Sequence, residues 1–175
     1  MIIDNTYFNN NILNLGTFET SNSRSNDAVE SKIAAIDFSI SVYEPKYLLE
    51  FMGMELYAEY ESTKSDSKWK PLIDKIRNEE KKRSPIANYI YFYHKRDNEI
   101  ASSDSVDYRP KVDNSTVISN DRRRALAWND MVYQNSVLFT WVHDNIVNAE
   151  TPTIVTTAVW DISGWERLLK EQVVL

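Results

Sequence analysis

The fold is decided by one stretch of the sequence, NDRRRALAWNDMVYQNSVLFTWVHDNIVN, residues 120–148. Apolar side chains recur along it at the spacing of one helical face, and Asn135 falls in the same row: Trp128, Met131, Val132, Leu138, Val142 and Ile146. Ser119, Asn120 or Asp121 can cap its first turn, and no proline or glycine interrupts residues 122–150. We therefore predict a helix of about seven or eight turns, which needs neighbours along its whole length.

Further helices are expected before this stretch. Their apolar periodicity and capping residues predict the ranges 28–42, 45–62, 68–82 and 85–96. Glu44-Pro45 should separate the first two, because the residue before a proline is pushed out of the helical conformation. Gly53 should mark a close approach of another backbone. The segment 85–96 is apolar or aromatic almost all round and should be the central helix. The prediction is a mainly α fold, a bundle of four to five helices.

Three segments lack a helical period and are expected to form extended arms. The predicted organisation is an N-terminal arm (1–26), a helical bundle domain (27–148) with an extended loop or hairpin at 97–118, and a C-terminal arm (149–175). A small amount of β structure is expected to be confined to 97–118 and 153–159, which contain β-branched runs. Extended arms without internal partners favour contacts with other molecules.

Composition excludes several classes of protein. The chain has no cysteine, so no disulfide framework, thiolate nucleophile or cysteine zinc site is expected. Its three glycines rule out glycine-rich phosphate loops, and its net charge of −6 argues against sequence-independent nucleic-acid binding as the main activity. No signal peptide and no membrane span are predicted.

No catalytic, cofactor or metal site is predicted. His94 and His143 lack the partners of a metal set, and the carboxylates favour solvated or ion-paired roles. Three consecutive arginines at the start of the long helix work against its dipole, so they are either solvated or offset by an anionic partner. The residues expected to contact partners are Tyr7, Phe8, Arg109, Arg122, Arg123, Arg124, Trp160, Trp165 and Leu175.

Several motifs support a comparison with a known group of proteins. They are MIIDNTYF (1–8), YEPKYLL (43–49) followed by Gly53 and ELY (55–57), SPIANYIYFY (84–93) and AWNDMV (127–132). Over residues 1–148 the chain resembles the head–tail connector proteins of tailed bacteriophages, also called adaptor, neck or ring proteins, especially those of crAss-like and related phages of Bacteroidetes.

The resemblance implies a virion structural protein and no enzyme. Copies of the chain would form a ring, commonly of twelve, below the portal protein, extend the DNA channel and dock the next neck or tail protein. Packaged DNA would pass without specific binding, and the protein would be found at the head–tail junction of the virion and in the host cytoplasm during assembly. Two other hypotheses stay open, a helical nucleic-acid-binding regulator using Arg122–Arg124 and a small enzyme or enzyme inhibitor.

Overall fold

The computed structural model describes residues 1–9, 13, 15, 26–102 and 120–171. These residues form a mainly helical molecule with no strand among them, which confirms the predicted fold class. The α-helices are α1 (Asn26–Met52), α2 (Met54–Thr63), α3 (Lys70–Ile76), α4 (Pro85–Ser102), α5 (Asn120–Val142) and α6 (Trp165–Leu168). Short 3-10 turns span Asn5–Phe8 and Ser67–Trp69, and a π-helical turn at His143–Val147 extends α5.

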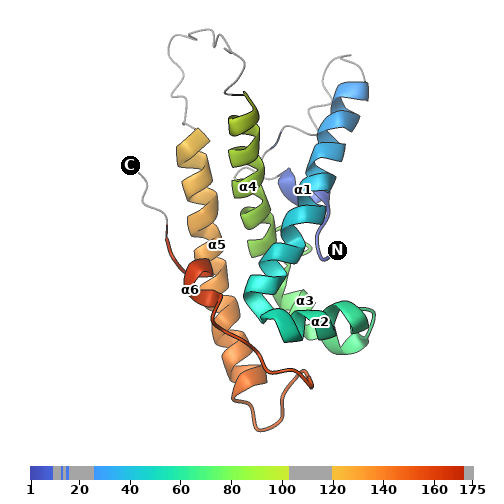
Figure 1. Ribbon diagram of the computed structural model, residues 1–175, viewed down its shortest axis with the longest axis vertical. Coiled ribbons are helices and arrows are strands. Elements are labelled where there is room, and N and C mark those ends of the chain that lie inside the picture. Colours follow the sequence, from blue (N-terminus) through green and yellow to red (C-terminus); the bar gives the residue numbers. More distant parts are fainter. Residues whose placement is uncertain (10–12, 14, 16–25, 103–119, 172–175) are drawn as a thin grey trace.

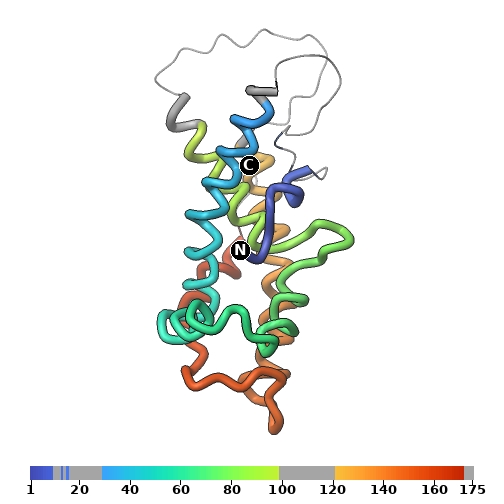
Figure 2. Tube along the Cα trace, turned by 90° about the vertical axis from the view of Figure 1, so that its right-hand side faces the viewer, coloured from blue at the N-terminus to red at the C-terminus, as the bar shows by residue number. Residues whose placement is uncertain are grey.

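The three long helices run side by side along the molecule. Helix α4 packs between α1 and α5, while α2 and α3 lie beside the lower half of this layer (Figure 1). The chain turns back after α5 and places α6 across that helix. In Figure 2 α6 and α3 with its following turn lie on opposite sides of the molecule.

The predicted central helix is confirmed. Ser84 caps α4, because its side-chain oxygen accepts the Ile86 backbone N–H at 3.2 Å, and Pro85 suits the first helical position, where no intrahelical N–H bond is needed. Its buried side chains lie on nearly all sides: Ile86, Ala87, Asn88, Tyr89, Ile90, Tyr91 and Tyr93.

The long helix is confirmed as well. Every residue of the predicted apolar row is buried, including Asn135, and Ala127 and Phe139 join them. The row stays continuous into the π-helical turn, where Ile146 is still buried. The 3.6-residue period was therefore a sufficient guide to the buried face of this helix.

The expected break at Glu44-Pro45 is wrong. Pro45 lies inside α1, which continues to Met52. Tyr43, Tyr47 and Leu48 are buried in one continuous row across the proline, so tertiary packing outweighs the local penalty of about 3 kcal/mol for an internal proline. The break falls at Gly53, whose φ of +79° favours glycine. The expected close approach is confirmed, because a Cβ added to Gly53 would collide with the side chain of Asp161.

The first residues do not project from the bundle as an arm. The backbone N–H groups of Ile2 and Ile3 donate to the Glu44 carboxylate at 2.8 and 3.2 Å. Ile2, Ile3, Tyr7, Phe8 and Leu13 are all buried in the core. Residues 1–9 and Leu13 therefore form part of the folded domain.

The described part of the C-terminal arm also packs against its own chain, and the expected strand at 153–159 is wrong. This stretch is irregular, because the Glu59 carboxylate of α2 accepts the backbone N–H groups of Thr157 and Ala158, both at 2.9 Å, in place of ladder bonds. Ile154 and Leu168 are buried. Of the predicted loop at 97–118, residues 97–102 continue α4, and 103–118 lie outside the described residues.

Candidate interaction surfaces

Two of the predicted contact residues, Tyr7 and Phe8, are core residues instead. Tyr7 is 1% exposed and Phe8 is fully buried. The Tyr7 hydroxyl donates to Glu79 at 2.8 Å, and burial together with this carboxylate raises the pKa of Tyr7. The interpretation of these two residues as a docking arm is therefore wrong, since they have almost no surface to offer to a partner.

Trp160 and Trp165 hold the C-terminal segment on the bundle. Both indole N–H groups donate to the Phe51 carbonyl, at 2.9 and 2.7 Å. The Trp165 ring stacks on Phe139 of α5, with the ring centroids 3.9 Å apart. Both side chains are half-buried by these contacts within the chain. These contacts give both tryptophans a role within the chain, and their contact with a partner stays a prediction.

The arginine cluster lies on the first turn of α5. Arg122 and Arg123 are exposed, and Arg124 pairs with Asp121 one turn earlier. That aspartate supplies part of the negative charge which the helix N-terminus favours. Arg109 and Leu175 lie outside the described residues, so their predicted contacts stay predictions.

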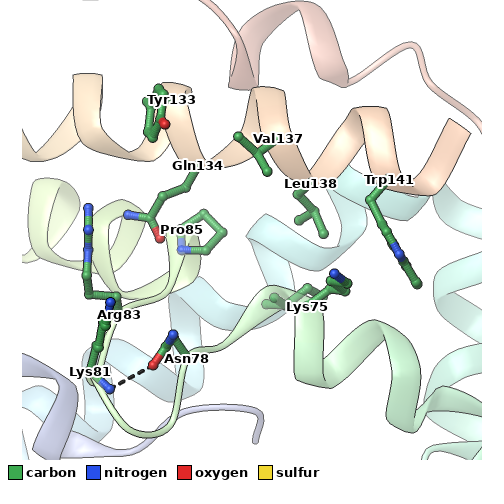
Figure 3. Close-up of a pocket in the computed structure, with 11 residues that line it drawn as sticks. Lys75, Asn78, Lys81, Arg83, Pro85, Tyr133, Gln134, Val137, Leu138 and Trp141 are labelled. Atoms are coloured by element: carbon green, nitrogen blue, oxygen red, sulfur yellow. Dashed lines mark hydrogen bonds between the residues drawn. The ribbon is translucent and has the colours of Figure 1, made fainter. Parts of the chain in front are cut away.

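A groove opens between α3, the turn at residues 77–84 and α5 (Figure 3). Its volume is about 340 Å³, and eleven residues line it. Three of them, Lys75, Lys81 and Arg83, are cations, and none is a carboxylate. Apolar side chains of α5 form the opposite wall, including Val137 and Trp141 (Figure 3). We call this surface the basic groove.

The turn that carries two of the cations is fixed by its own hydrogen bonds. Asn78 and Arg83 exchange backbone bonds of 2.7 and 3.1 Å, and the Asn78 side chain accepts the Lys81 backbone N–H at 2.7 Å. Arg83 pairs with Asp130 of α5 at 2.6 Å, which anchors the turn to the bundle. Lys75 reaches over the Trp141 ring, 5.6 Å from its centroid. The side chains of Lys75 and Arg83 and the backbone of Lys81 are therefore held at the groove.

Two apolar side chains of α5 in the wall of the basic groove are largely exposed to solvent. Tyr133 keeps 67% of its surface exposed and Val137 keeps 59%. Both fall outside the buried row of α5. Sequence reasoning missed them, although two large apolar residues on the polar side of an amphipathic helix are a signal of a contact surface.

A second exposed apolar surface lies where α1 meets the C-terminal segment. Met54, Val159 and Ile162 are 76%, 79% and 56% exposed, and the exposed carboxylates of Glu55 and Asp161 lie among them in sequence. Met54 and Asp161 line one shallow hollow of about 260 Å³. We call these five residues the acidic edge.

A cation next to the acidic edge is already paired. Arg167 of α6 donates to Glu50, which also lines the hollow, at 2.7 Å, and to the Tyr93 hydroxyl. This pair leaves the charges of Glu55 and Asp161 to give the edge its negative character.

The basic groove and the C-terminal segment occupy opposite faces of α5. Successive residues of an α-helix are rotated by about 100°, so Val137 points about 200° away from Asn135. Asn135 and Phe139 contact the C-terminal segment through Leu168 and Trp165, whereas Tyr133 and Val137 line the groove. The acidic edge lies away from α5, at the junction of α1 and α2, so the two exposed apolar surfaces occupy different parts of the molecule.

No described residues form a candidate centre for metal chemistry or a membrane span. Within the described ranges, no group of three or more histidine, cysteine, aspartate or glutamate side chains could hold a metal ion. No helix in that part of the chain is long and apolar enough to cross a membrane. Comparisons with protein-family models, curated proteins and solved structures find no match to this chain.

Proposed function

We propose that this chain is a structural subunit of a tailed-bacteriophage virion, a head–tail connector that forms a ring below the portal protein. The observation that carries the proposal is the pair of exposed apolar surfaces at different places on the subunit, the basic groove and the acidic edge. Large exposed apolar side chains favour protein contacts. A closed ring needs two different contact faces on each subunit, because each copy binds one neighbour on either side.

The resemblance in residues 1–148 supports the same assignment and supplies the place in the particle. The ring would extend the DNA channel and give the next neck or tail protein a platform. A net charge of −6 suits a channel wall, because a wall without excess cations does not retain passing DNA. The described residues of both terminal segments pack within the chain, so docking relies on surfaces of the folded subunit, including the exposed side chains at residues 159–162, rather than on free arms.

The test is co-assembly with the portal of the phage that encodes the chain. Purified protein is mixed with portal rings, and the products are analysed by light scattering after size exclusion and by cryo-electron microscopy. We expect an additional ring of density coaxial with the portal. A protein that binds neither itself nor the portal, and that is missing from purified particles, would contradict the proposal.

The alternative is a nucleic-acid-binding regulator, favoured by the exposure of Arg122 and Arg123 at the start of α5. Binding of this kind weakens steeply with salt, because it depends on releasing counterions from the phosphates. A mobility-shift titration at several salt concentrations separates the two functions. Tight, salt-sensitive binding that is lost in an Arg122→Ala/Arg123→Ala variant would favour the regulator, whereas the connector binds duplex DNA weakly with or without these arginines.

A further inference from the structure

We infer that the basic groove of one copy binds the acidic edge of a second copy of this chain. This inference rests on the proposed function, because both require the subunit to associate with itself. It adds which two surfaces meet and which side chains lie at the contact.

Charge is the first argument for this partner. The groove gathers Lys75 and Lys81 with no carboxylate among its lining residues, in a chain whose net charge is −6, while the charge of its third cation, Arg83, is offset by Asp130. At short range, a cationic surface on an acidic protein attracts the acidic surface of another copy of the same protein. Beyond about 8 Å at physiological salt the repulsion between the net charges is screened. Complementary charges of this sort fix the register and choice of partner more than the affinity.

Apolar surface is the second argument. Tyr133 and Val137 at the groove, and Met54, Val159 and Ile162 at the edge, each keep more than half of their surface exposed. Burying such side chains against each other gives the favourable term, since each Å² of apolar surface removed from water contributes about 25 cal/mol. The groove volume of about 340 Å³ lies at the low end for small-molecule sites. It suits one or two side chains from a protein partner.

The placement of the two surfaces determines the kind of assembly. The groove lies between α3 and α5 and the edge lies at the junction of α1 and α2, so the contact joins different surfaces of the two copies. Such a contact leaves an unused groove on one copy and an unused edge on the other, and it is repeated by every added copy. The product is a closed ring or an open filament rather than a two-fold dimer.

Disulfide cross-linking tests the contact directly, because the chain has no cysteine of its own. One protein variant carries Val137→Cys at the groove, and a second carries Ile162→Cys at the edge. The two variants are mixed and oxidised. We expect covalent dimers between the two variants to form faster than dimers within either sample. Phe38→Cys, which is 70% exposed on α1, is the matched control partner for Val137→Cys. Equal rates with Ile162→Cys and Phe38→Cys would overturn the inference.

Charge reversal supplies an independent readout on the assembly of full chains. Lys81→Glu and Glu55→Lys each place like charges across the contact, and each is expected to weaken association at least tenfold in sedimentation velocity. The chain carrying both changes restores opposite charges at every contact and should recover most of the association. Lys32→Glu, exposed on α1, alters the net charge as Lys81→Glu does and should have little effect. Helical content by circular dichroism confirms that the variants fold.

The outcomes separate this inference from the proposed function. If the chain assembles on itself or on the portal but Lys81→Glu behaves like Lys32→Glu, the groove–edge contact is wrong and the connector function stands. If the cross-link and the charge rescue both appear while purified particles lack the protein, the contact stands and the connector function is wrong. If no concentration yields the cross-link above the Phe38→Cys control, the contact is wrong regardless of what the particles contain.

Discussion

Tyr47 and Asn135 are joined by a buried hydrogen bond of 2.6 Å from the tyrosine hydroxyl to the asparagine amide oxygen. The amide nitrogen of Asn135 donates in turn to the Leu168 carbonyl at 2.9 Å. Burial raises the pKa of Tyr47 well above its usual value, so the hydroxyl stays protonated and able to donate. One fully buried amide therefore connects α1, α5 and the C-terminal segment.

Replacing Asn135 by alanine should destabilise the whole fold. The change leaves the Tyr47 hydroxyl and the Leu168 carbonyl buried without this partner, and each unsatisfied group costs about 1–3 kcal/mol. We expect the free energy of unfolding to fall by about 2–4 kcal/mol in urea denaturation. Ser136→Ala, at the exposed neighbouring position, should change it by less than about 0.5 kcal/mol. Equal effects of the two substitutions would contradict this role.

Gly53→Ala should loosen the contact between the end of α1 and the C-terminal segment. Alanine at φ +79° is strained, and its Cβ would collide with the Asp161 side chain. We expect a loss of about 1–3 kcal/mol of stability, measured by urea denaturation with tryptophan fluorescence, because Trp160 and Trp165 contact Phe51 nearby.

Asp161→Gly in the Gly53→Ala background separates the two causes. It removes the collision and leaves the backbone strain. Gly53→Ala should therefore cost less stability in the Asp161→Gly variant than it costs in wild type. A Gly53→Ala protein that unfolds at the wild-type urea concentration would show that neither cause matters.

The helical faces could be predicted from the sequence, and the helix boundaries around Pro45 and Gly53 could not. Burial along α4 and α5 follows the 3.6-residue period because each helix is packed along its length. At Pro45 the local preference against a proline inside a helix predicted a break, but tertiary packing keeps α1 continuous. At Gly53 the chain adopts a positive φ and packs closely against Asp161, which is far away in sequence.

The packing of the C-terminal segment depends on pairings between distant residues. Glu59 binds Ala158 across 99 positions, and Arg167 pairs with Glu50 across 117. A run such as Thr153–Val159 has the composition of a strand, and only its carboxylate partner on α2 shows that it is irregular. The basic groove combines residues from α3, a turn and α5, so sequence alone offered the exposed Tyr133 and Val137 as its only signal.

Glu59 should make stability depend on pH in the acidic range. Its hydrogen bond from Lys68, together with the backbone N–H groups of Ala158 and Thr157, lowers the pKa of Glu59 from 4.5 to about 2. Its stabilisation is complete above pH 4.5. It is lost as the pH falls from about 4.5 to about 2, because the unfolded chain binds the proton first.

The measurement is the free energy of unfolding of wild type and Glu59→Gln across this range. The variant should be less stable at neutral pH, and the difference from wild type should shrink as the pH approaches 2. Glu61→Gln, at an exposed carboxylate on the same helix, should leave the wild-type pH profile nearly unchanged. A constant difference between wild type and Glu59→Gln would mean that Glu59 acts through packing and not through its charge.

His94 should make the fold less stable as the pH falls below its ordinary pKa. Its Nε2 lies 2.9 Å from the Asn98 amide nitrogen, which can only donate, so Nε2 accepts. Its Nδ1 lies 2.8 Å from Ser39 Oγ, whose own proton goes to the Ala35 carbonyl at 3.0 Å, so Nδ1 carries the ring proton. This arrangement fits the neutral ring, and burial lowers the pKa of His94 below 6.5, with Lys95 adding to the effect.

Below pH 6.5 the unfolded chain therefore binds a proton that the folded chain resists, and stability falls as the pH drops through the folded-state pKa. Titration of the imidazole by NMR in a His143→Gln background, which leaves one histidine, should give a midpoint below 6.5. His94→Gln should flatten the dependence of unfolding free energy on pH between about 7 and about 5. A midpoint at or above 6.5 would mean that the protonated ring finds an acceptor near Asn98, and the assigned donor pattern would be wrong.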